Sequence, residues 1–142
     1  MALSFKGTSV DSNLKKAVEI MGGEPINEMG SCFDAAAMTF CSPGQDIVPT
    51  DRLCHGLGIA NMPGQEGEII AHAWIEFDRG GTRFAYEAIW GVVIPAKNLR
   101  SDLKVSYVVE YTVEEVRKNW TIHNMPGPWD EKIKNFLLKN LL

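Results

Sequence analysis

One β-hairpin pattern in the middle of the chain constrains its fold more than any other sequence feature. Over residues 69–77, small and apolar side chains alternate with polar or bulky ones, which is the period-two pattern of a β-strand. Residues 78–81, Asp-Arg-Gly-Gly, have the composition of a tight turn, and residues 82–90 are typical of a returning strand. The sequence therefore predicts an antiparallel hairpin, and residues 91–94 are expected to extend its second strand until Pro95 ends it.

Helix patterns lie on both sides of the hairpin. The apolar side chains of residues 33–40 recur at the spacing of an amphipathic helix, which is predicted to start at Cys32 with Ser31 as its N-cap. Because helices and antiparallel strands are segregated along the chain, the predicted fold class is α+β. The other expected elements are a helix over 12–21, an extended segment over 52–62, a strand over 103–112, a short helix over 113–120 begun by a Thr112–Glu115 capping box, and a last helix from about residue 129.

The composition fits a single globular domain spanning residues 1–142. Of the 142 residues, 45% are apolar and 23% are charged, which excludes a disordered or fibrous chain. The net charge of −4 indicates no basic surface of the kind that binds nucleic acid. No stretch approaches roughly 18 consecutive apolar residues, so no membrane span is expected.

The cysteines and the N-terminus predict a cytoplasmic location. Three irregularly spaced cysteines cannot all pair within one chain, so free thiols in a reducing compartment are expected. Residues 1–10 carry one lysine and lack the apolar core of a secretory signal. These features leave the oligomeric state open.

Cys32 is the first candidate for chemistry. It follows the flexible pair Gly30-Ser31 at a predicted helix start, where free N–H groups and the helix dipole stabilise a thiolate, although Asp34 opposes this effect. The same N–H groups can donate to the oxyanion of an attacked carbonyl. Position alone is equally compatible with a buried structural cysteine. Cys41 and Cys54 are expected to be packed, inert thiols.

His72 and Glu87 are the second and third candidates, because the hairpin brings them together. A four-residue loop at 78–81 would place them directly opposite each other. A two-residue loop at Gly80-Gly81 would place Glu87 opposite Trp74 and diagonal to His72. Both registers keep the two side chains on one face and within reach. A carboxylate on one imidazole nitrogen would fix the tautomer of the other, but a cross-strand polar pair without catalytic use has the same pattern.

Together these residues resemble the transglutaminase-like superfamily of papain-fold cysteine enzymes, as a small bacterial or phage-type member. The resemblance rests on Gly-Ser-Cys-Phe-Asp-Ala-Ala at 30–36, Ala-His-Ala-Trp-Ile-Glu at 71–76, and an acid fifteen residues after the histidine. It covers roughly residues 30–87, and the His-Ala-Trp-Ile-Glu segment is its specific part. The family usually has aspartate, often followed by proline, where this chain has Glu87 and Ala88.

The resemblance implies a papain-like α+β fold, in which the cysteine helix packs on a small antiparallel sheet, and thiol-dependent acyl chemistry without a cofactor or metal. Cys32 would form a thioester, His72 would act as the base, and Glu87 would orient the histidine. The expected substrate is a peptide or an amide-bearing small molecule, which Trp74 would help to bind. Hydrolysis or transfer to an amine would complete the reaction, with Asn27 as the candidate side-chain donor to the oxyanion.

Two other functions fit the same sequence. The first is a non-catalytic peptide- or protein-binding module on the same fold, with tryptophans lining a groove. The second is a metal site, although no Cys-x-x-Cys or His-x-x-His spacing supports one. The groove would use Trp74, Trp90 and the Trp120/Trp129 region, and the metal site would use Cys32, Cys54, His55 and His72.

Overall fold

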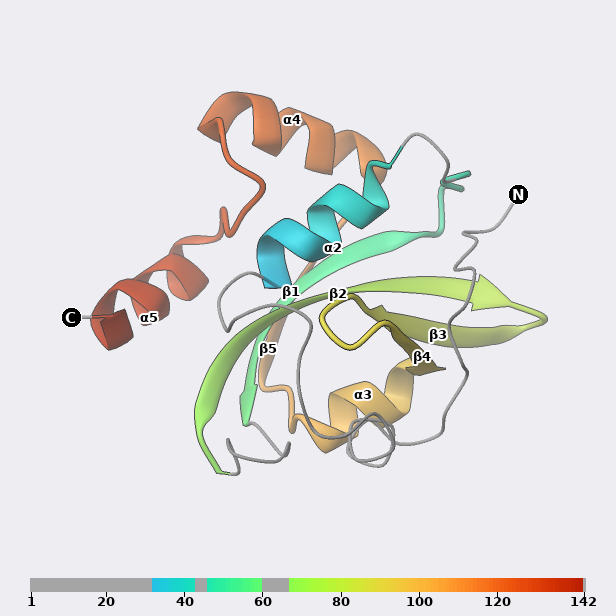
Figure 1. Cartoon of the computed structure of the whole chain (residues 1–142), viewed down its shortest axis with the longest axis horizontal. Helices are drawn as coiled ribbons and strands as arrows, with labels where there is room; N and C mark the ends of the chain where they lie inside the picture. Colours follow the sequence, from blue (N-terminus) through green and yellow to red (C-terminus); the bar gives the residue numbers. More distant parts are fainter. Residues whose placement is uncertain (1–31, 43–45, 60–66, 142) are drawn as a thin grey trace.

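The computed structural model describes residues 32–42, 46–59 and 67–141, and its centre is a five-stranded antiparallel sheet. The strands lie in the order β4-β3-β2-β1-β5 (Figure 1). The described residues also form four helices, so the predicted α+β class is confirmed. The elements are α2 (Cys32–Phe40), β1 (Arg52–Ile59), β2 (Ile69–Arg79), β3 (Thr82–Glu87), β4 (Val92–Pro95), α3 (Ala96–Asp102), β5 (Tyr107–Tyr111), α4 (Val113–His123) and α5 (Glu131–Leu141).

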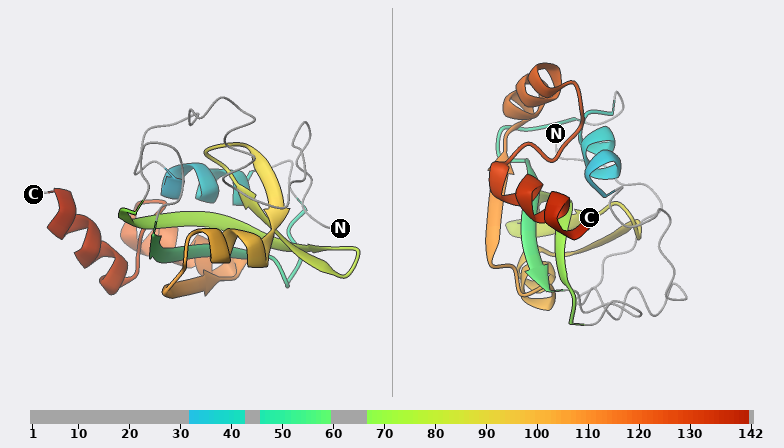
Figure 2. Two further views of the ribbon diagram at one scale, coloured as in Figure 1. Left: turned by 90° about the horizontal axis from the view of Figure 1, so that it is seen from below. Right: turned by 90° about the vertical axis from the view of Figure 1, so that its left-hand side faces the viewer.

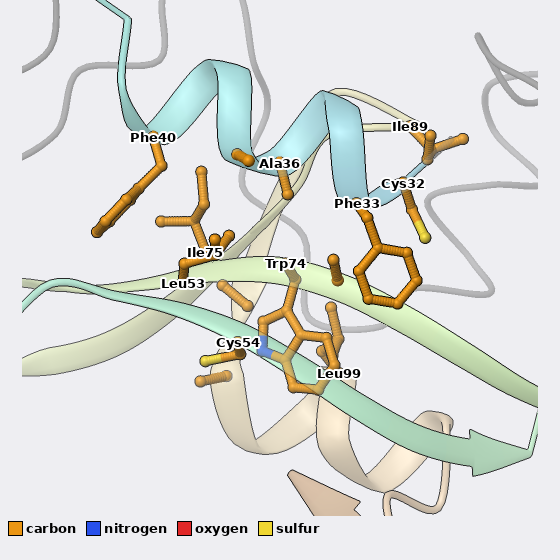
Figure 3. Packing of buried hydrophobic residues seen from close by; sticks show 14 of the residues in the cluster. Cys32, Phe33, Ala36, Phe40, Leu53, Cys54, Trp74, Ile75, Ile89 and Leu99 are labelled. Carbon is orange, nitrogen blue, oxygen red and sulfur yellow. The ribbon is translucent and has the colours of Figure 1, made fainter. Parts of the chain in front are cut away.

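Helices α2 and α3 cover opposite faces of the sheet (Figure 2). Ile75 of β2 points toward α2, whereas Trp74 points the other way, toward Leu99 of α3 (Figure 3). Because both faces are covered, every residue from His72 to Phe77 is buried. The alternation that predicted this strand therefore separates two buried faces, one apolar, with Ala73, Ile75 and Phe77, and one carrying His72, Trp74 and Glu76.

The tip of the β2–β3 hairpin settles which of the two predicted registers exists. Arg79 pairs with Thr82, so the connection consists of Gly80 and Gly81 alone. Both glycines have positive φ, at 58° and 83°, as a type I′ turn between antiparallel strands requires, and glycine adopts these angles without strain. The register is the one that sets Glu87 diagonal to His72.

The predicted extension of the second hairpin strand through residues 91–94 is wrong. The strand ends at Glu87, the chain reverses, and β4 returns antiparallel to β3 with Val92 opposite Glu87. The reversal is closed by a 2.8 Å hydrogen bond from the Gly91 N–H to the Glu87 carbonyl. Gly91 has a φ of 67°, so the one residue that enters the left-handed region is the one without a Cβ.

Helix α3 was not predicted, and it shortens the strand that was expected over residues 103–112. It begins after Pro95, which serves as its N-cap residue, and it ends at the C-cap Leu103. Its seven residues are too few for a clear helical period, and the buried pair Leu99 and Leu103 is the apolar signal in that stretch. Consequently β5 begins only at Tyr107.

Both helices expected after the sheet are present. Thr112 and Glu115 form the predicted capping box: the Glu115 N–H donates to Thr112 Oγ1 at 3.2 Å, and the Thr112 N–H donates to Glu115 Oε1 at 3.0 Å. Helix α4 ends before Asn124, which has a left-handed φ of 54°. At the start of α5, the Asp130 carboxylate accepts the N–H of Ile133.

Among the helices of the described residues, none is long and apolar enough to cross a membrane. The helix expected over residues 12–21 lies outside the described residues.

Replacing Thr112 with alanine should lower the free energy of unfolding by about 1 kcal/mol, because it removes the side-chain oxygen that accepts the Glu115 N–H at the start of α4. Urea denaturation followed by circular dichroism measures the change. Thr121→Ala is the matched control, since Thr121 bonds only to a carbonyl within the same helix. Equal losses for the two variants would contradict a special role for the cap.

Candidate active site

Cys32 is the first residue of α2, as predicted, and helix packing fixes its position. Phe33 and Ala36 are buried against the sheet, and the small alanine lets the helix lie close to the strands (Figure 3). Cys32 is itself buried and lies at the end of the helix where backbone N–H groups lack partners within the helix. The predicted cap Ser31 and the candidate oxyanion donor Asn27 lie outside the described residues.

His72 lies where β2 runs past the end of β3. Its backbone partner in β1 is Gly56. On the other side, the pairing of β2 with β3 ends at Ile75 and Tyr86, one residue before Glu87. From there Glu87 reaches diagonally to the histidine, and its Oε1 lies 2.8 Å from His72 Nε2. The structure thus brings these two predicted residues into direct contact.

The turn between β3 and β4 holds the Glu87 carboxylate in place. The side chain is 0% exposed, and its second oxygen, Oε2, accepts the backbone N–H of Trp90 at 2.6 Å. Sequence reasoning missed this N–H. The signal that could have found it is Gly91, because a glycine four residues after a polar strand end marks a reversal that a side chain can cap.

The imidazole of His72 is shared between Glu87 and Cys32. Burial favours the neutral ring, but the charge and hydrogen bond of the Cys32 sulfur, followed by those of the Glu87 carboxylate, raise the pKa of His72 to about 10. Because Glu87 occupies Nε2, Nδ1 is the nitrogen left for the sulfur. The three predicted catalytic residues therefore form one cluster, in which the Cys32 sulfur and the Glu87 carboxylate flank the imidazole of His72.

The other acids of the hairpin are engaged elsewhere. Glu76 accepts hydrogen bonds from Trp74 Nε1 and from Arg100 Nε, each at 2.8 Å. Asp78 forms an ion pair with Arg83 near the tip of the hairpin. This arrangement leaves neither acid free to orient the histidine.

The structure corrects the prediction that Trp74 binds substrate. Its side chain is 0% exposed and lies in the core between the sheet and α3 (Figure 3). Trp90 and Trp129 are also buried, at 4% and 5% exposed. These three indoles therefore do not line an open groove, whereas Trp120, the fourth tryptophan of the predicted groove, is only partly buried. A non-catalytic binding module that uses other surfaces stays an alternative.

The four-residue metal site is not assembled either. Cys54 and His55 are neighbours in β1, so their side chains point to opposite faces of the sheet. Within the described ranges, the group close enough to hold a metal ion is Cys54, Glu76 and Glu110. Arg100 already bonds to both of these carboxylates, so the acids are neutralised by a side chain of the protein.

The two other cysteines differ from Cys32 in their surroundings. Cys41 follows the last residue of α2 and is half-buried, whereas Cys54 is fully buried in β1. Burial raises the pKa of both thiols, and for Cys54 the nearby carboxylates raise it further. A raised pKa favours the protonated thiol, which is the weaker nucleophile, so these surroundings agree with the prediction that Cys41 and Cys54 are inert.

Comparison with known proteins assigns the chain to no family: no family model, no curated protein and no solved structure matches it.

Iodoacetamide at neutral pH should label Cys32 before Cys41 and Cys54, because only Cys32 shares a hydrogen bond with a histidine. Peptide mapping of the folded protein at short times identifies the labelled thiol. Cys41→Ala should leave the labelling rate unchanged, and His72→Ala should slow it markedly. Faster labelling of Cys41, which is the more exposed thiol, would contradict the nucleophile assignment.

The His72 imidazole should stay protonated through neutral pH and lose its proton near pH 10, since its pKa is raised. NMR titration of the histidine Cε1–H resonances, assigned with His72→Gln, measures this. Glu87→Gln removes a charge that stabilises the imidazolium, so the ring should lose its proton at lower pH. Asp78→Asn is the control and should not move the titration. A wild-type ring that titrates near 6.5 would disprove the cluster.

Proposed function

We propose that this protein is a cysteine-dependent acyl-transfer enzyme with a transglutaminase-like, papain-type fold. The observation that carries the proposal is the contact of one imidazole with both the Glu87 carboxylate, at 2.8 Å, and the Cys32 sulfur at a helix start. A buried thiol, a base and an orienting acid in hydrogen-bond contact are the parts that nucleophilic catalysis requires.

The arrangement of elements supports the papain-type assignment. The cysteine begins a helix that packs on an antiparallel sheet, and the histidine and the acid lie on the successive strands β2 and β3. This is the arrangement that the resemblance of residues 30–87 to the transglutaminase-like superfamily implies. Glutamate replaces the usual aspartate, and the diagonal register gives its longer side chain a use, because it must cross from Glu87 to a residue that is not its direct partner.

The chemistry follows from the charges of the cluster. The Cys32 sulfur attacks a carbonyl carbon, and the proton that the thiol has given up resides on His72. A tetrahedral oxyanion forms, and the free N–H groups at the start of α2 can donate to it. When the C–N bond breaks, the imidazolium gives its proton to the leaving amine, and a thioester remains on Cys32.

The second half of the reaction uses the same residues. Neutral His72 takes a proton from water or from an amine, and that nucleophile replaces the sulfur at the acyl carbon. Water gives a carboxylic acid, and an amine gives a new amide. Glu87 keeps the imidazole oriented in both halves without taking up a proton itself. The proposed substrates are peptides or small amide-bearing molecules, and the chemistry needs no cofactor.

Incubation with 4-nitrophenyl acetate should release nitrophenolate and add one acetyl group to Cys32, because an activated ester needs no specific binding to acylate a thiolate. Intact-mass analysis and peptide mapping locate the group, and hydroxylamine should remove it, as it does from a thioester. Adding a primary amine distinguishes acyl transfer, which yields the amide, from hydrolysis.

Two variants control this experiment. Cys32→Ala should abolish acetylation without a large loss of thermal stability, since removing one small side chain at a helix start leaves little cavity. Cys41→Ala should acylate like the wild type. Acetylation that persists in Cys32→Ala, or a Cys32→Ala protein that no longer folds, would count against the proposal and favour a structural cysteine.

A further inference from the structure

The rings of Trp74 and His72 are neighbours with nearly parallel planes. The two ring centroids are 6.2 Å apart, and the planes are inclined by only 22°. Both residues lie on the same face of β2, two positions apart. The contacts with Cys32 and Glu87 hold the imidazole at its nitrogens. A neighbouring ring parallel to the imidazole adds resistance to rotation of the ring about the line through those nitrogens. The indole is the neighbour that lies nearly parallel to the imidazole plane.

The indole is itself held by charged groups. Its Nε1–H donates to Glu76 Oε2 at 2.8 Å, and the same oxygen accepts Arg100 Nε at 2.8 Å. The Arg100 guanidinium carbon also lies 6.0 Å from the centroid of the indole. Arg83 Nε lies 3.4 Å from the other oxygen of Glu76. Glu76 is 3% exposed, so this anion is buried and needs these donors.

The strand opposite leaves the space that the indole occupies. Gly56 is the direct partner of His72 in β1. A Cβ at Gly56 would lie 2.9 Å from Cη2 of Trp74 and 2.9 Å from the carbonyl oxygen of Tyr107, closer than real Cβ contacts. The absence of a Cβ at Gly56 thus lets the six-membered ring of the indole lie over β1, and α3 lies on the same side of the sheet as the indole (Figure 3).

The geometry points to Trp74 as a positioning residue that fixes the plane of the His72 imidazole, with Glu76 and Arg100 as its anchor. This inference rests on the proposed function, because a fixed plane matters for a ring that must pass a proton between a sulfur and a leaving group. Trp74 touches no substrate in this role and acts only through His72. Its burial, which excludes contact with substrate, is what makes the stack rigid.

Trp74→Phe tests the role, because it keeps an aromatic ring and removes the N–H that bonds to Glu76. A less firmly positioned imidazole holds the Cys32 sulfur less well, so the rate of Cys32 alkylation should fall about tenfold, comparable to the loss of one hydrogen bond. The titration of His72 should move to lower pH, because its contacts with the sulfur and the Glu87 carboxylate weaken. Trp129→Phe is the matched control. It also removes a buried indole N–H with a 2.8 Å hydrogen bond, to the Met125 carbonyl, and its ring packs on His55 and Tyr111.

The two variants should lose similar stability in urea, but only Trp74→Phe should change the rate and the titration. Equal effects of both variants on these two readouts, or no effect of either, would overturn the inference. Glu76→Gln keeps an acceptor for the indole and should retain more of the alkylation rate than Glu76→Met, which keeps none. Equal rates would also count against it. If wild-type protein forms no acyl-enzyme, the proposed function fails, but the His72 titration still reports whether Trp74 positions the ring.

Discussion

The buried carboxylate of Glu87 is the constraint on which the rest of the site depends. A fully buried anion is costly unless each of its oxygens has a partner. One oxygen takes the Trp90 N–H in the β3–β4 turn, and the other contacts His72 on β2. The sharp turn, the hairpin register and the position of the imidazole are therefore coupled, since a change in any one of them would leave the charge unpaired.

The same rule governs the second buried acid of the hairpin. Glu76 lies on β2 as His72 does, but it is neutralised by Arg100 and Arg83 and bonded by the indole of Trp74. Because α2 and α3 cover opposite faces of the sheet, these polar groups are shielded from water, and their mutual contacts are strong. Glu87 binds the β3–β4 turn and the histidine, whereas Glu76 binds the indole of Trp74 and two arginines.

Several features of fold and site could be predicted because they depend on neighbours close in sequence. The start of α2 at Cys32, the capping box of Thr112 and the presence of a hairpin turn within residues 78–81 each depend on residues a few positions apart, although the choice of Gly80-Gly81 as the turn came from the structure. Residues 91–94 and α3 were missed for the opposite reason. The reversal at Gly91 accompanies the burial of the Glu87 carboxylate, whose other partner, His72, lies on the preceding strand. Helix α3 has only seven residues, which is too short for a helical period to be detected.

The sequence by itself determined that His72 and Glu87 share a face, because side chains alternate along a strand and both plausible loops differ by an even step. It could not determine which oxygen meets which nitrogen, nor that Cys32 reaches the same ring. The contact between Glu87 and His72 depends on the hairpin register and on the β3–β4 turn. The contact of Cys32 with the same ring depends on how α2 packs on β2, between segments some forty residues apart in the sequence. Trp74 shows the difference most clearly: alternation assigned its face, but only the presence of α3 on that face decided that the indole is buried.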